Sequence, residues 1–201
     1  MKKVFISIIF LVLIIFLFLI ILLNNKKIDQ SGNKIGSDSA SVQIVQYGDL
    51  RCPHCKSFHN EIFPEIKKDY IAKGKVSFEY RDIGILGYES YKLGKLSYII
   101  NKHSPSEYWS YIDNALNETA NPNKLIDKLD VSKNTKSKIK KDYKEHDNYA
   151  DKKMEKNLET AHNKSIEVVP SVTINGEKIE NIKKYKTVKN IINEEIESSN
   201  K

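Results

Sequence analysis

The chain contains only two cysteines, Cys52 and Cys55, and they are separated by two residues. A pair so close together cannot hold distant segments to one another, so no disulfide framework supports this fold. Any sulfur chemistry must take place between these two thiols, or between one of them and another molecule. The fold itself must therefore depend on a packed core, and residues 42–201 have the length of one such domain.

An unbroken apolar segment of 20 residues, from Val4 to Leu23 with Ser7 as its polar interruption, precedes that domain. As a helix it would span roughly 30 Å, whereas the apolar part of a cleavable signal peptide has about 7–15 residues. We therefore expect residues 4–23 to be a single transmembrane anchor and residues 1–3 to be a cytoplasmic tail. A long signal peptide that is removed on export is the alternative. Both interpretations place the cysteines on the extracytoplasmic side of the cell membrane, where disulfides persist.

Residues 24–41 are polar and rich in Ser, Gly, Asn and Asp, which predicts a flexible tether. The formal net charge of the whole chain is +7, but the lysines beyond the tether are scattered among acidic residues. Because the chain has no arginine-rich stripe interleaved with aromatic residues, the sequence gives little support to nucleic-acid binding. The abundance of Lys, Asn and Ile is typical of an AT-rich genome and hints at a bacterial source.

The cysteine motif lies between a predicted strand and a predicted helix. Val42 to Tyr47 is a short β-branched run that stops at Gly48. Pro53 suits the first position of a helix, where its missing N–H costs nothing, and Pro64 should kink that helix. Residues 75–82 alternate as a second strand. The apolar positions at helical spacing are Phe58, Ile62, Ile66 and Tyr70.

From about residue 88 to residue 165 the pattern is helical, with breaks at Ser104-Pro105 and Asn121-Pro122. Strand character returns only in residues 168–174, and Asn175-Gly176 then predicts a hairpin. A final helix is expected over residues 188–196. The sequence therefore predicts an α/β domain over residues 42–201, in which a helical subdomain is inserted at about residues 88–165.

Two cysteines at the start of a helix are suited to redox chemistry. We expect Cys52 to face solvent and Cys55 to be carried one turn into the helix and partly covered. Unpaired N–H groups at the helix start stabilise a thiolate at Cys52, and His54, when protonated, adds a positive charge beside it. A dithiol whose reduced form is stabilised gives up its disulfide readily, so this motif is predicted to oxidise other proteins.

The Cys52-Pro53-His54-Cys55 motif after a strand, the long helical insertion and Val169-Pro170 before a hairpin resemble the DsbA-type thiol–disulfide oxidoreductases, in particular the membrane-anchored BdbD-like proteins. These landmarks span about residues 42–196. The resemblance implies a thioredoxin fold with a helical insertion, no cofactor, and net oxidation of reduced secreted or membrane polypeptides. It also implies that the catalytic residues are Cys52, Pro53, His54 and Cys55.

The resemblance further implies that Pro170 is a cis-proline facing the dithiol. The backbone of Val169 would then be free to pair with an extended substrate segment beside Cys52, so Val169 and Pro170 are the expected substrate-binding residues. It also implies a partner that reoxidises the dithiol, namely a membrane quinone-linked thiol oxidase of the BdbC or DsbB type.

One position departs from the family pattern. Thioredoxin-like proteins often carry a buried acid six residues before the first cysteine, where it helps to move the proton of the second, and this chain has Gln46 there. An amide cannot accept that proton. Asp49 and Glu79 are candidate replacements because they lie near the motif in the chain or on the adjacent predicted strand.

Alternative functions remain open at this stage. An anchored thiol reductase could share the same fold, although His54 argues against it. A non-catalytic module, either a metal carrier or a chaperone that holds exported chains, is a further possibility. His59 lies one helical turn beyond Cys55 and could join the cysteines as a metal ligand, but no fourth ligand is evident and we expect no metal site.

Overall fold

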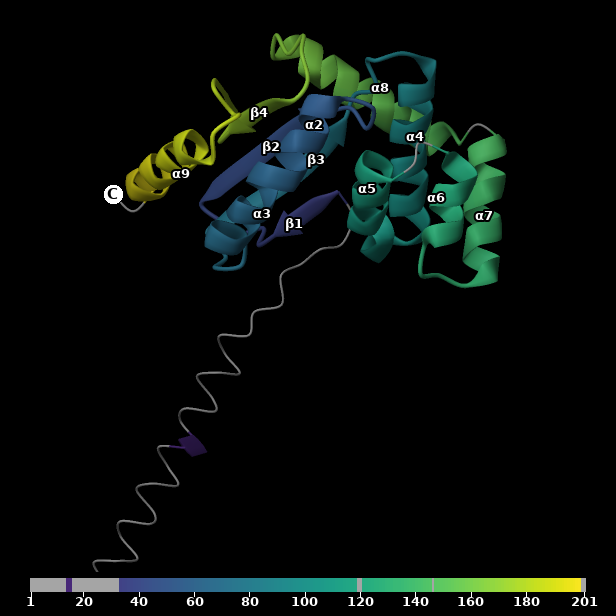
Figure 1. Ribbon diagram of the computed structural model, residues 1–201, viewed down its shortest axis with the longest axis horizontal. Helices are drawn as coiled ribbons and strands as arrows, with labels where there is room; N and C mark the ends of the chain where they lie inside the picture. The colour runs from purple at the N-terminus through teal and green to yellow at the C-terminus, as the bar shows by residue number, and fades with distance from the viewer. Residues whose placement is uncertain (1–13, 16–32, 119–120, 146, 200–201) are drawn as a thin grey trace, which may run out of the picture.

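The computed structural model describes residues 14–15, 33–118, 121–145 and 147–199 (Figure 1). Apart from Ile14 and Ile15, the predicted membrane anchor lies outside these residues, as do the predicted cytoplasmic tail and residues 24–32 of the predicted tether. Within the described ranges, no helix combines the length and the apolar character needed to cross a membrane.

One mixed β-sheet forms the centre of the described part of the chain (Figure 1). Its strands are β1 (Lys34–Gly36), β2 (Val42–Gly48), β3 (Val76–Asp82), β4 (Ser171–Ile174) and β5 (Glu177–Ile179). They lie in the order β1-β3-β2-β4-β5. Strands β2 and β3 are parallel, with Gln46 opposite Tyr80 and Gly48 opposite Asp82, and the other neighbours are antiparallel. The strands predicted on either side of the motif helix are confirmed.

A parallel pair of strands needs a crossover connection, and the helix that follows the cysteine motif supplies it. This helical stretch is made of α2 (Pro53–Ser57), η1 (Phe58–Ile62), α3 (Phe63–Ile66) and η2 (Lys67–Ile71), of which η1 and η2 are π-helical. Pro64 has no N–H to donate, and in the turn before it the Phe63 N–H donates to the Phe58 carbonyl, five residues back. The interruption predicted at Pro64 therefore takes the form of a π-helical turn.

Strand β1 lies within the segment that the sequence assigned to a flexible tether. It pairs with β3 in antiparallel register, so that Ile35 lies opposite Phe78. The Ile35 side chain is only 1% exposed and belongs to the main core. For residues 34–36 the tether prediction is wrong, because one buried isoleucine and the free edge of β3 are sufficient to order a short polar segment.

The helical insertion predicted between residues 88 and 165 is confirmed. It consists of α4 (Tyr88–His103), the 3₁₀ turn η3 (Pro105–Glu107), α5 (Tyr108–Asn117), α6 (Pro122–Lys128), α7 (Lys133–Lys144) and α8 (Asn148–Asn163). The breaks at Pro105 and Pro122 lie where they were predicted. Two further breaks were not predicted, and side-chain caps mark them: Ser132 accepts from the Thr135 N–H, and Asp147 accepts from the Ala150 N–H.

After the insertion, the chain returns to the sheet later than the sequence indicated. The strand predicted from residue 168 begins at Ser171, because residues 168–170 form a bend that ends in a proline without an N–H for the ladder. The predicted hairpin is confirmed, and its turn residues Asn175 and Gly176 have φ values of 48° and 91°. Helix α9 (Tyr185–Ser199) is longer than the predicted 188–196 and packs against η2, where the Tyr70 hydroxyl donates to Asn193 Oδ1 over 2.7 Å.

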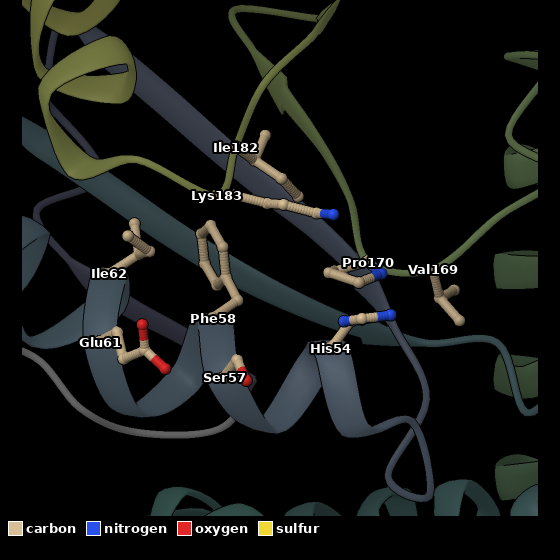
Figure 2. A pocket seen from close by; sticks show the side chains of 9 residues that line it. All are labelled: His54, Ser57, Phe58, Glu61, Ile62, Val169, Pro170, Ile182 and Lys183. Atoms are coloured by element: carbon tan, nitrogen blue, oxygen red, sulfur yellow. The ribbon is translucent and has the colours of Figure 1, made fainter.

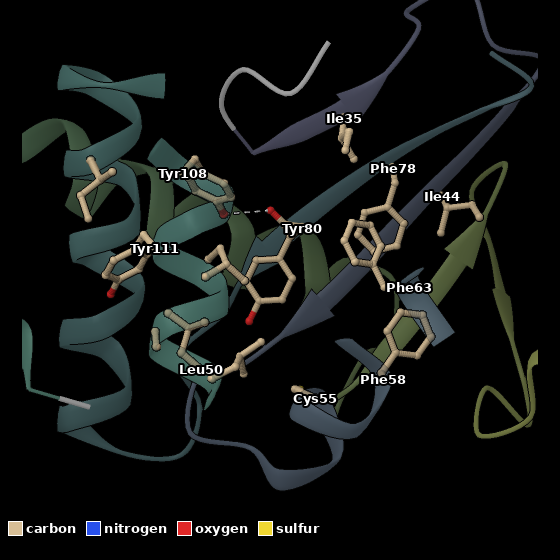
Figure 3. Close-up of a cluster of buried hydrophobic side chains, with 14 of the residues drawn as sticks. Ile35, Ile44, Leu50, Cys55, Phe58, Phe63, Phe78, Tyr80, Tyr108 and Tyr111 are labelled. Carbon is tan, nitrogen blue, oxygen red and sulfur yellow. Dashed lines mark hydrogen bonds between the residues drawn. The ribbon is translucent and has the colours of Figure 1, made fainter. Parts of the chain in front are cut away.

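Aliphatic and aromatic side chains together form the main core, which fills the face of the sheet beneath the crossover helix (Figure 3). The ring of Phe63 packs against Phe78 of β3 at 4.7 Å and against Trp109 of α5 at 5.2 Å. Because α5 joins this cluster, the inserted helices and the sheet share one core. The Cys55 side chain also belongs to this main core. A smaller cluster consists of Val45, Tyr47, Ile83, Ala161 and Ile166.

Candidate active site

The two thiols lie at the first turn of α2, where the parallel strand β2 delivers the chain. Cys52 is the N-cap residue, and its carbonyl accepts the first helical hydrogen bond, from the Lys56 N–H over 3.1 Å. Pro53 occupies the first helical position, as predicted. Both cysteines are free thiols. The sequence therefore places a dithiol at the positive end of a helix, with one thiol outside the first turn and one within it.

Cys55 is completely buried, and Cys52 is 6% exposed. The Cys55 sulfur accepts a hydrogen bond from the Asp49 N–H at 3.4 Å. Burial raises the pKa of the Cys55 thiol far above its ordinary value, and the Asp49 N–H offsets only part of that effect. Cys55 is therefore a thiol at neutral pH and needs a partner for its proton whenever it reacts.

The segment before β4 covers Cys52. The peptide bond between Val169 and Pro170 is cis, as the family resemblance implied. The Cys52 thiol donates a long hydrogen bond to the Val169 carbonyl over 3.5 Å. Cys52 is therefore less exposed than the sequence indicated, because the 169–170 segment lies over it. Among the described residues, no backbone partner is found for the Val169 N–H, which leaves a donor beside the thiol.

A pocket of about 410 Å³ adjoins this segment (Figure 2). Exposed His54 and half-buried Pro170 flank it at the dithiol end, and apolar side chains from η1 and the loop before α9 continue it. One acidic side chain, Glu61, and one basic side chain, Lys183, also line the pocket. The lining residues are His54, Ser57, Phe58, Glu61, Ile62, Val169, Pro170, Ile182 and Lys183. This arrangement can hold a peptide whose apolar side chain enters the pocket while its backbone passes Val169.

Gln46 and the two candidate proton acceptors named from the sequence, Asp49 and Glu79, have different surroundings. Gln46 is buried, with 2% exposure, and its side-chain Nε2 has no hydrogen-bond partner in the described structure. Glu79 is bound by Arg81 through two hydrogen bonds of 2.8 and 2.9 Å. Asp49 lies beside Cys55, but its carboxylate accepts from the Arg51 N–H, the Leu86 N–H and the Ser90 hydroxyl.

His59 does not join the cysteines. Its ring stacks on Phe63 at 5.5 Å and its Nε2 lies 3.4 Å from Asp113 Oδ1. Burial lowers the pKa of His59, and the Asp113 carboxylate offsets part of that effect. In the described ranges, no group of three or more His, Cys, Asp or Glu side chains is placed to hold a metal ion.

Two site residues escaped the sequence analysis. Asp82, at the end of β3, is completely buried, and the Tyr80 hydroxyl donates to its Oδ2 over 3.3 Å. Both residues lie about thirty positions from the cysteines, and only the pairing of β2 with β3 brings them to the dithiol. The sequence signal that could have identified Asp82 is its position at the end of a predicted strand that runs parallel to the strand before the cysteine motif.

Comparison of the sequence with a family model and with known proteins gives matches over most of the chain. A sequence model described as Thioredoxin matches residues 29–194. Disulfide bond formation protein D of Bacillus subtilis is 28% identical over 169 residues, which cover 81% of this chain and 76% of the relative.

Solved structures agree with the fold. The crystal structure of oxidised BdbD from Bacillus subtilis superimposes with a TM-score of 0.73 at 24% identity and covers 83% of this chain and 97% of that one. The structure of alpha-DsbA1 from Wolbachia pipientis gives a TM-score of 0.68 at 21% identity, with 83% and 92% covered. At these identities the likeness concerns the fold.

Proposed function

The chain belongs to the thioredoxin family and is a DsbA-like thiol–disulfide oxidoreductase, and we propose that it works as an oxidase that donates a Cys52–Cys55 disulfide to reduced polypeptides. The observation that carries this proposal is the position of the 169–170 segment. The Val169 carbonyl lies 3.5 Å from the Cys52 sulfur, and the pocket continues from Pro170. A substrate bound there presents its cysteine to Cys52 and not to the buried Cys55.

The reaction consists of two thiol–disulfide exchanges. A substrate thiolate attacks the Cys52 sulfur of the oxidised protein, the bond to Cys55 breaks, and Cys55 takes up the electron pair and a proton. A second substrate thiolate then attacks the substrate sulfur of this mixed disulfide, and Cys52 leaves as a thiolate. The substrate loses two electrons, which the dithiol gains. Helix N–H groups near Cys52 stabilise that leaving thiolate, and a protonated His54 would add to this stabilisation.

We place this reaction on the extracytoplasmic side of a bacterial membrane, with residues 4–23 as a single-pass anchor. The length and apolar character of that segment support the proposal. Turnover requires a partner disulfide that accepts the two electrons, and we propose a membrane quinone-linked thiol oxidase of the BdbC or DsbB type. An anchor would hold both proteins in one membrane and raise their effective concentration.

Replacing Cys55 with Ala tests the proposal in cells. Without Cys55, a mixed disulfide at Cys52 cannot be resolved within the protein, so covalent adducts with cysteine-containing exported proteins should accumulate. Non-reducing electrophoresis and mass spectrometry of the membrane and soluble fractions would identify them, and we expect the adducts in the membrane fraction.

The matched control is the double variant that also carries Cys52→Ser, in which the adducts should disappear. An absence of adducts in the Cys55→Ala cells, or adducts only with cytosolic proteins, would contradict the proposed function.

A further inference from the structure

Cys55 must exchange a proton in each half of the cycle. It gains one when the substrate displaces it from Cys52, and it loses one when it re-forms the disulfide. Because Cys55 is completely buried, water has little access to its sulfur. The side-chain amide of Gln46, on strand β2, can neither supply nor accept this proton.

Tyr80 lies directly opposite Gln46 in the parallel β2–β3 pair and is also buried. A Cβ atom at Gly48 would approach the Tyr80 hydroxyl to 2.7 Å and the ring to 2.5 Å, so the glycine that ends β2 makes room for this phenol. Figure 3 shows the Tyr80 hydroxyl directed toward the end of the sheet at which Leu50 and Cys55 lie. Tyr80 thus brings a hydroxyl group to the Cys55 side of the sheet.

Asp82 is the hydrogen-bond partner of that hydroxyl. It is completely buried, and its Oδ2 accepts from Tyr80 over 3.3 Å. Among the described residues, no lysine, arginine or histidine forms an ion pair with it. A carboxyl group in such a position is costly to ionise and is therefore a strong base once it is ionised.

The surroundings of Asp82 also favour the protonated form of its carboxyl group. Burial raises its pKa well above the ordinary value, and the nearby Asp49 carboxylate raises it further. The Tyr80 hydroxyl and the backbone N–H groups of Gly84 and Leu50 oppose this shift but do not cancel it. A general acid–base group works best when its pKa lies near the operating pH. The titratable groups whose charges interact with Asp82 are Asp49, Cys55, Tyr80, Tyr98, Tyr108 and Tyr111.

We infer that Asp82, through the Tyr80 hydroxyl, exchanges the proton of Cys55 in place of the acid that Gln46 replaces. This inference rests on the proposed function only in that Cys55 must react. When Cys55 leaves Cys52, Asp82 gives its proton to Tyr80 and Tyr80 passes its own to the Cys55 thiolate. When Cys55 attacks Cys52, both protons move in the reverse direction. Neither step changes the number of electrons on the carboxyl or the phenol.

The test isolates the step in which Cys55 acts. The reduced protein is loaded at Cys52 with a coloured aromatic thiol as a mixed disulfide, and the release of that thiol by Cys55 is followed by stopped-flow absorbance from pH 5 to pH 9. Asp82→Asn should slow the release about 10- to 100-fold near pH 7, since general acid–base groups contribute about 10²- to 10⁴-fold and water takes over part of the role. Tyr80→Phe, which keeps the ring, should slow it about 3- to 10-fold.

The pH profile separates a proton-exchange role from a structural one. In the natural protein the rate should rise as Asp82 ionises and then level off, whereas in Asp82→Asn it should rise steadily with hydroxide. Glu79→Gln, which changes an acid on the same strand that is bound by Arg81, is the control and should leave the profile unchanged.

Equal rates in Asp82→Asn and the control, or a slower rate with an unchanged pH profile, would overturn the inference. If Asp82→Asn does not fold, Tyr80→Phe alone decides, and a normal rate and profile in that variant would refute the relay. Because the assay measures Cys55 attack whatever the physiological direction of electron flow, such a result would leave the oxidase proposal standing.

Discussion

At the scale of single residues, two buried carboxylates near one thiol have different partners. Asp49 accepts hydrogen bonds from three donors, which are the N–H groups of Arg51 and Leu86 and the Ser90 hydroxyl. Asp82 accepts a long hydrogen bond from a phenol, and the backbone N–H groups of Gly84 and Leu50 also favour its charged form, but burial outweighs these effects. The cysteine pair was evident from its local motif, and the family resemblance implied the cis-proline. Sequence reasoning missed Asp82 because the partners that distinguish one buried acid from another are set by strand register.

The stability of an Asp82→Asn variant should depend on pH in a defined direction. Because the pKa of Asp82 is raised in the folded state, the folded protein binds more protons than the unfolded chain between about pH 4 and the raised pKa. The stability contributed by the protonated carboxyl is complete below about pH 4 and is lost as the pH rises through the folded-state pKa. The Asp82→Asn variant has no carboxyl group at this position, so it does not lose this stability as the pH rises.

Urea unfolding from pH 4 to pH 9 would measure this effect. The free energy of unfolding of the variant, relative to that of the natural protein, should increase with pH and then level off. Glu79→Gln provides the control for the loss of a carboxylate from β3. A difference that stays constant over the whole range would show that Asp82 does not titrate within it.

At the scale of elements, local signals predicted the interior of each helix and strand better than its ends or its short neighbours. The β-branched run of β2 and the Asn175-Gly176 turn each carry their own structural preference. Strand β1 carries almost none, since three residues with a single apolar side chain are ordered by the burial of Ile35 and by pairing with the edge of β3. The caps Ser132 and Asp147 were visible in the sequence, but they were not used to divide the insertion.

Ile35→Ala tests whether β1 is part of the folded domain. Ile35 is 1% exposed within the main core, and removing a buried isoleucine side chain costs about 2–5 kcal/mol. The free energy of unfolding should fall by that amount in chemical denaturation.

Lys34→Ala in the same strand is the matched control. It removes only an exposed ion pair with Asp38 and should cost about 1 kcal/mol or less. Equal and small effects of both variants would mean that residues 34–36 behave as a tether after all.

At the scale of the whole molecule, the sheet, the crossover helix and the segment after the insertion meet around Cys52. Strand β2 delivers Cys52 to a helix start, and the 169–170 segment, which follows α8, covers it and borders the pocket. The order of these elements was predictable from the sequence. The contact of Trp109 in the insertion with Phe63 of the crossover helix was not, because it depends on how α5 packs on the sheet.

The central claim is that this arrangement makes the dithiol an oxidant, and its equilibrium reduction potential tests that claim most directly. The domain, starting before β1, would be equilibrated in glutathione buffers, and the fraction of oxidised Cys52–Cys55 would be measured by thiol labelling and mass spectrometry. The helix N–H groups and the adjacent His54 favour the reduced form, so we predict a potential near that of DsbA, about −120 mV. A potential near that of thioredoxin, about −270 mV, would contradict the account and assign the protein to the reductases.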